Sequence, residues 1–172
     1  MLGFINNFFK NRPDKELKVS PQVPERPKSD QFSIGYDPNL IDELEGTHVH
    51  LVNLFGRIWS EFEQTNYGKV ATLINQFKAD FQAHLLTENV KFYVYLEQAL
   101  ADDKHNLKIV KEFRTDMNEI ANAAIKFCRT YQGKFTPEMV QNFKSDYTNI
   151  GEIVTRRVSL EEKSLYILYR PR

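Results

Sequence analysis

The sequence predicts an all-α fold, namely an antiparallel up-down-up-down four-helix bundle that follows a proline-rich N-terminal extension. From residue 37 onward, apolar residues recur at steps of three and four, which places them on one face of a helix. The chain of 172 residues is the size of one domain and has only seven glycines, and the alternation typical of β-strands is scarce. Short breaks divide this region into four long segments, and short connections make neighbouring helices antiparallel.

The N-terminal extension comprises residues 1–37 and differs in composition from the predicted bundle at residues 38–172. Four prolines between residues 13 and 27 alternate with charged side chains, which is typical of a linker. Ahead of them, the apolar residues of segment 1–9 recur at helical spacing. We expect this segment to form a short amphipathic helix that docks on the bundle, on a protein partner or weakly on a membrane interface.

Proline-containing start signals place the first and last helices of the bundle. The pair Asp37-Pro38 combines an N-cap with proline at the first helical position, so a helix is expected at about residues 38–64. The pair Thr136-Pro137 repeats this signal for a last helix at about residues 137–169. The second and third helices lie between the remaining breaks, which are expected at residues 65–68, 101–104 and 132–135.

Polar residues interrupt the inward faces of three of the four predicted helices. They are His48 in the first helix, His84 and Glu88 in the second, and Arg157 and Glu161 in the fourth. Their distances from the turns put them at a similar depth, so they should meet in one layer. Burying a carboxylate or a guanidinium without a partner costs several kcal/mol, so we expect these side chains to be paired or to bind a metal ion.

An internal echo links the second and fourth helices. The segment His84-Leu-Leu-Thr-Glu88 precedes its counterpart Arg157-Val-Ser-Leu-Glu161 by 73 residues. A histidine and a glutamate four residues apart on a helix face the same way and can share one metal ion. The second copy carries arginine in place of the histidine.

Composition and motifs exclude several classes of protein. The 23 basic and 23 acidic side chains balance, so bulk charge does not favour binding to nucleic acid. Cys128 is the one cysteine and cannot form a disulfide within the chain, which suits the reducing cytoplasm. No apolar run reaches the roughly 18 residues of a membrane span, and no phosphate-binding loop or Ser/His/Asp pattern indicates catalysis. We therefore expect a cytoplasmic protein without enzymatic activity and without stable membrane insertion.

Three parts of the chain carry a resemblance to a known family: His48, the segment His84-Leu-Leu-Thr-Glu88-Asn-Val-Lys-Phe-Tyr, and the segment Leu160-Glu161-Glu162-Lys-Ser-Leu-Tyr166. They are similar to the bacterial hemerythrin-like (HHE cation-binding) domains, and the similarity covers about residues 38–169. It implies a four-helix bundle that binds non-heme iron, often as an oxo-bridged pair, and that takes up O2 reversibly or responds to redox state. By position, His48, His84, Glu88 and Glu161 would be the metal ligands.

Two departures from this family change what the site can hold. Arg157 stands where the family has a histidine, and the predicted third helix offers Phe113 and Met117 where the family has histidines. One hypothesis is therefore a sensor or regulator with a reduced site, in which the four remaining ligands hold one divalent ion. Imidazole and carboxylate ligands suit iron, manganese or zinc.

The alternative hypothesis is a metal-free regulator that acts through protein contacts. Here the planar fork of Arg157 bridges Glu88 and Glu161 in a buried salt bridge and takes the place of the ion. Residues 150–163 are similar to the last helix of the regulator of sigma D family, bacterial anti-sigma proteins, and arginine fits that resemblance. In this case the function lies on an outer surface, and the protein partner is unknown.

Overall fold

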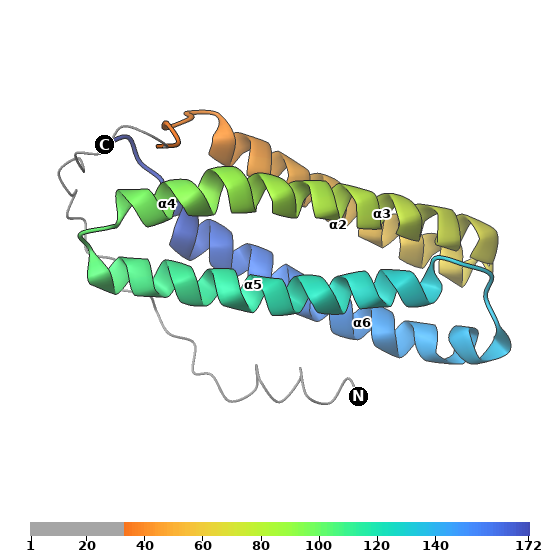
Figure 1. Cartoon of the computed structure of the whole chain (residues 1–172). Coiled ribbons are helices and arrows are strands. Elements are labelled where there is room, and N and C mark those ends of the chain that lie inside the picture. The colour runs from red at the N-terminus through yellow and green to blue at the C-terminus, as the bar shows by residue number, and fades with distance from the viewer. Residues whose placement is uncertain (1–32) are drawn as a thin grey trace.

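Four antiparallel helical rods make up the computed structural model, which describes residues 33–172 (Figure 1). They are built from α2 (Leu40–Glu63), α3 (Tyr67–Thr87) continued by α4 (Tyr93–Ala99), α5 (Lys104–Tyr131) and α6 (Pro137–Leu160). The prediction of an all-α four-helix bundle is confirmed, and no strand occurs between residues 33 and 172. The amphipathic segment predicted at residues 1–9 lies outside the described residues.

The first and last helices of the bundle begin within two residues of the starts predicted from Asp37-Pro38 and Thr136-Pro137. At α6, the Thr136 side chain accepts a hydrogen bond from the backbone N–H of Met139, as predicted for an N-cap. The helix α2 instead begins at Leu40 with Asn39 as its N-cap, so the expected cap at Asp37 is wrong. The Asp37 carboxylate accepts a hydrogen bond from the backbone N–H of Asn39, so it stabilises the turn that leads into the helix.

Two single π-helical turns interrupt the rods at equivalent positions, which the prediction of continuous helices did not include. The turn η1 (Glu88–Phe92) joins α3 to α4, and η2 (Glu161–Leu165) follows α6 and leads into the short 3₁₀ turn η3 (Tyr166–Leu168). In each π turn the backbone N–H five residues after the first glutamate donates to that glutamate's carbonyl. The repeat in the sequence is therefore also a repeat in backbone geometry. Single π-helical turns are frequent at functional sites.

Each π turn adds a residue to its rod, and two consecutive side chains at its end point inward. Phe92 and Tyr93 are both buried after the first turn, and Leu165 and Tyr166 are both buried after the second. The two turns thereby bring two tyrosines into the interior next to the polar layer.

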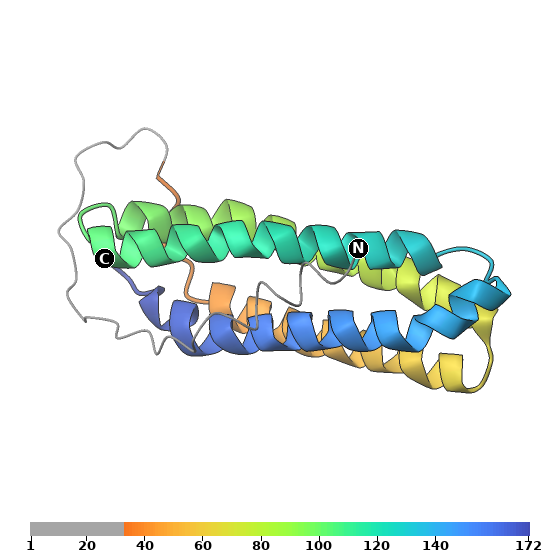
Figure 2. The same ribbon diagram turned by 90° about the horizontal axis from the view of Figure 1, so that it is seen from below.

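The apolar core is divided in two by the polar layer. One part fills the end near the α2–α3 turn and includes Ile58, Phe77 and Phe143. The other fills the opposite end, near the α4–α5 turn, and includes Leu44 and Phe92. The views in Figures 1 and 2 show α2 beside α3 and α5 beside α6, so side chains from neighbouring rods meet throughout the interior.

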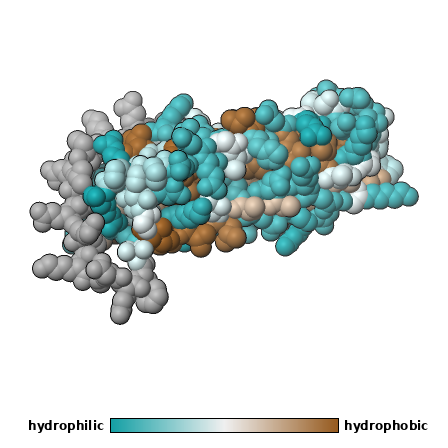
Figure 3. Space-filling view, turned by 90° about the horizontal axis from the view of Figure 1, so that it is seen from above, coloured by the Kyte–Doolittle hydropathy of each residue, from teal (hydrophilic) through white to brown (hydrophobic). Residues whose placement is uncertain are grey.

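The outer surface is mainly polar. The face in Figure 3 shows mostly hydrophilic residues with smaller apolar areas among them. The large apolar side chains that are most exposed in the described part of the chain include Val49, Val52 and Leu86. None of the helices between residues 33 and 172 combines the length and the hydropathy that a membrane crossing requires.

Candidate metal centre

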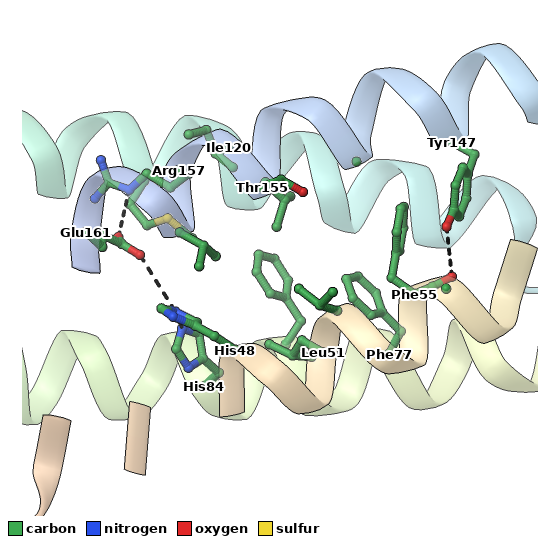
Figure 4. A pocket seen from close by; sticks show the side chains of 17 residues that line it. His48, Leu51, Phe55, Phe77, His84, Ile120, Tyr147, Thr155, Arg157 and Glu161 are labelled. Atoms are coloured by element: carbon green, nitrogen blue, oxygen red, sulfur yellow. Dashed lines mark hydrogen bonds and ion pairs between the residues drawn. The ribbon is translucent and has the colours of Figure 1, made fainter. Parts of the chain in front are cut away.

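The structure brings together all five polar residues that interrupt the helix faces. His48 comes from α2, His84 from α3 and Arg157 from α6, while Glu88 and Glu161 are the first residues of the two π turns. All five are at least 95% buried. Nε2 of His84 lies 3.2 Å from Nε2 of His48 and 3.7 Å from Oε2 of Glu88. Nε2 of His48 lies 3.8 Å from Oε2 of Glu161 (Figure 4).

Hydrogen bonds on the far side of each imidazole fix its tautomer. The Thr47 hydroxyl donates to the carbonyl of Leu44 at 2.8 Å, so its oxygen accepts the proton on Nδ1 of His84, also at 2.8 Å. The Glu162 carboxylate accepts the proton on Nδ1 of His48 at 2.9 Å. In the neutral form of each ring, Nε2 is therefore unprotonated and faces the other ring. Metal-ligating histidines are commonly held in this way by a partner on the second ring nitrogen.

Neither Thr47 nor Glu162 was assigned a role from the sequence. Thr47 precedes a candidate ligand, and Glu162 follows one, but spacing along a helix does not show which ring nitrogen a side chain on another rod will reach. A threonine or a carboxylate next to an inward-facing position was the only signal that the sequence offered.

Glu88 has the least compensated environment in the layer. Its side chain is fully buried, and neither carboxylate oxygen has a hydrogen-bond partner among the described residues. Burial raises the pKa of Glu88 well above its usual range, and the nearby Glu161 raises it further, while Arg157 opposes the shift only in part. A carboxylate in this position either keeps a proton or meets a cation.

Burial also holds His84 in its neutral form. Burial, followed by the neighbouring His48, lowers the pKa of His84 from 6.5 to about 3. Neutral imidazole is the form that binds metal ions. One ligand atom each from His48, His84 and Glu88 lies within 4.8 Å of the other two, so this group can hold a cation. The donor set of two nitrogens and one carboxylate suits a divalent transition metal.

Arg157 is tied to Glu161 and not to Glu88. Its Nε donates to Oε1 of Glu161 at 2.7 Å, and its Nη2 donates to the hydroxyl of Tyr93 at 2.7 Å. The guanidinium carbon lies 4.5 Å from the centre of the Phe113 ring. The predicted bridge to both glutamates is therefore wrong in its Glu88 half, because the π turn brings Tyr93 into reach as the second acceptor.

The third rod supplies no ligand to the layer. Phe113 packs on the guanidinium, and Met117 belongs to the apolar core on the α2–α3 side. The inward face of α5 is apolar apart from Asn106, which is buried near the start of the helix. The candidate ligand atoms are therefore gathered on one side of the layer, and the guanidinium lies on the other side.

Comparison with known proteins adds two relatives. Transcript termination protein A18 of Myxoma virus (strain Lausanne) is 32% identical over 154 residues, which is 78% of this chain and 31% of that protein. The protein with the same name from Rabbit fibroma virus (strain Kasza) is 32% identical over 87 residues, which is 48% of this chain and 18% of that protein. This chain thus spans less than a third of the length of either relative.

No solved structure gives a significant match to the chain. The family described as the hemerythrin HHE cation binding domain matches residues 39–168, which include every residue of the buried polar layer. The four-rod fold agrees with this match. The chain therefore belongs to the hemerythrin HHE cation-binding domain family.

Proposed function

We propose that this protein holds a single divalent metal ion, iron being the first candidate, and acts as a non-enzymatic cytoplasmic sensor or regulator. His48, His84 and Glu88 would bind the ion, and Glu161 would face it with Oε2 while its Oε1 stays with Arg157. The observation that carries the proposal is the unpartnered Glu88 carboxylate beside two imidazole nitrogens that both present lone pairs.

The buried charges support one cation. Two buried carboxylates, Glu88 and Glu161, face one buried guanidinium, Arg157, so one negative charge is uncompensated. A divalent ion would compensate that charge and would separate the two facing lone pairs, which repel each other when nothing lies between them. A second ion is disfavoured because the guanidinium repels it and because α5 contributes no residue to the candidate ligand group.

A bound transition metal would supply redox change or an open position for a small ligand, and these are the two properties a sensor can use. The residues of this chain would set its conditions. Thr47 and Glu162 hold the imidazoles in the binding tautomer, and the surrounding apolar core limits the access of water.

Elemental analysis tests the proposal directly. Protein expressed with iron, manganese and zinc should carry about one metal ion per chain, and His48→Gln should lose it. His50→Gln is the matched control, because His50 lies two residues away on the same helix, is exposed and bonds Asp80. A metal content near zero in the parent protein, or equal loss in both variants, would refute the proposal.

The second candidate function is the metal-free regulator, and the Arg157 network favours it. A buried arginine with two hydrogen bonds and an aromatic contact forms a stable layer without any ion. Arg157→His separates the two cases. A variant that takes up more iron than the parent protein shows that arginine has displaced an ion, whereas one that only unfolds supports a structural salt bridge.

A further inference from the structure

A cavity of about 230 Å³ reaches the polar layer from the side of α2 and α6. His48, His84, Arg157 and Glu161 line one end, and Phe55 and Tyr147 line the other (Figure 4). Between the two ends the walls are mainly apolar and come from all four rods: Leu51, Phe77, Phe81, Met117, Ile120 and Val154. Such walls offer water few partners, so the cavity is suited to an apolar occupant.

An aromatic stack closes the far end of the cavity. The rings of Phe55 and Tyr147 lie parallel with centroids 4.1 Å apart, and the Tyr147 hydroxyl donates to the backbone carbonyl of Phe55. Trp59 packs on Tyr147 with centroids 5.2 Å apart. Gly151 leaves room for this stack, since a Cβ there would lie only 3.1 Å from the Phe55 ring. The far end is therefore a fixed wall with a tryptophan directly behind it.

The inner end would carry a positive charge once a metal ion is bound. Among the buried groups, two carboxylates against one guanidinium and one divalent ion leave an excess of one positive charge. The Glu162 carboxylate beside His48 is partly exposed, so solvent screens its charge. Glu88 does not line the cavity, whereas both histidines do, so an occupant of the cavity meets the ligand set from a side other than that of Glu88. A monoanion at this end would complete the neutralisation of the buried charges.

We propose that the cavity binds a medium-chain monocarboxylate, with its alkyl chain along the apolar walls and its carboxylate at the inner end. This inference rests on the proposed metal site for the carboxylate and on the cavity walls for the chain. An apolar cavity of about 150 Å³ holds a benzene molecule, so the larger cavity here has room for a chain of about eight carbons. The apolar chain of such a ligand thus matches the cavity walls, and its single negative charge matches the inner end.

Trp59 provides the readout, because it is the only tryptophan in the chain and packs against the cavity wall. Protein loaded with Zn²⁺, which has no redox chemistry, would be titrated with octanoate and with 1-octanol while the tryptophan emission is followed. Octanoate should bind on the order of tenfold more tightly than 1-octanol, a difference that corresponds to one charged contact. Removal of the zinc with a chelator should abolish this preference.

Two variants test the location. Thr155→Phe narrows the cavity from an exposed position on α6 and should weaken octanoate binding on the order of tenfold. Thr148→Phe is the matched control, because Thr148 is exposed on the same helix but does not line the cavity. Val154→Phe fills the interior and should abolish binding, with the circular dichroism spectrum reporting whether it still folds.

The outcomes separate this inference from the proposed function. No response to octanoate in protein that carries one zinc per chain overturns the inference and leaves the metal site intact. Equal affinity for octanoate and 1-octanol overturns the placement of the carboxylate. Protein that takes up no zinc overturns the proposed function, and the carboxylate placement with it. Equal weakening by Thr155→Phe and Thr148→Phe overturns the assignment of the cavity.

Discussion

Glu88 and Glu161 begin equivalent π turns, and replacing each with glutamine should have opposite effects on the stability of metal-free protein. Glu161 bonds the buried Arg157, so Glu161→Gln leaves a buried guanidinium without its charge partner. Breaking a buried ion pair in this way costs about 3 to 5 kcal/mol. Glu88 has no hydrogen-bond partner within residues 33–172 to lose, so Glu88→Gln removes only the cost of burying an ionisable group.

The size of the Glu88 effect depends on pH in a defined direction. The folded chain raises the pKa of Glu88 above the ordinary value of 4.5. The contribution of the Glu88 side chain to the free energy of unfolding is therefore fully present below pH 4.5 and is lost as the pH rises. Above the unfolded pKa, the loss amounts to about 1.4 kcal/mol for each pH unit until the folded pKa is passed. The free energy of unfolding of Glu88→Gln should therefore be close to that of the parent protein at pH 5 and should exceed it increasingly as the pH rises to 7.

Urea unfolding followed by circular dichroism measures both effects after treatment with a chelator. The three proteins would be compared at pH 5, 6 and 7, and the free energy of unfolding obtained by linear extrapolation. A loss of several kcal/mol in Glu88→Gln at every pH would refute the reasoning, because it would mean that a buried positive group pairs with Glu88. In metal-loaded protein the same variant should lose the stabilisation that the ion provides.

Further predictions concern the frame around the site. Gly56→Ala should stabilise the protein by about 1 kcal/mol, because Gly56 is exposed in mid-helix and no described atom lies within 4 Å of its Cβ position. Gly151→Ala should not give this gain, because its Cβ would lie against the Phe55 ring. Thermal unfolding of both variants checks this, and an equal rise in Tm would contradict it. Burial raises the pKa of the Cys128 thiol to about 12, so a thiol reagent at pH 8 should react with it only after unfolding, and rapid modification of the folded protein would be inconsistent with its position. His84 is neutral when folded with a pKa of about 3 but titrates near 6.5 when unfolded, so its contribution is present above pH 6.5 and lost as pH falls towards 3. In the metal-free Glu88→Gln variant, the free energy of unfolding should therefore fall by about 1 kcal/mol between pH 6 and pH 5. A free energy of unfolding that stays constant over this range would contradict the prediction.

The sequence by itself determined the four helices and the membership of the polar layer. Helical periodicity is local, so residues spaced at three and four positions must share a face whatever packs against it. This is why His48, His84 and Glu161 could be assigned to the interior from their positions alone. The relative depth of these residues followed from helix length and from the turns.

Only the tertiary structure decided which atoms pair within that layer. The first π turn placed Tyr93 within reach of Arg157, and this contact, together with Glu161, left Glu88 without a hydrogen-bond partner among residues 33–172. A π turn shifts the facing of every later side chain in the helix by one residue position, and local helix propensity does not predict where such a turn occurs. Hydrogen bonds between rods depend on such shifts and on side-chain rotamers, because a partner one helix away is not encoded in the spacing of either helix.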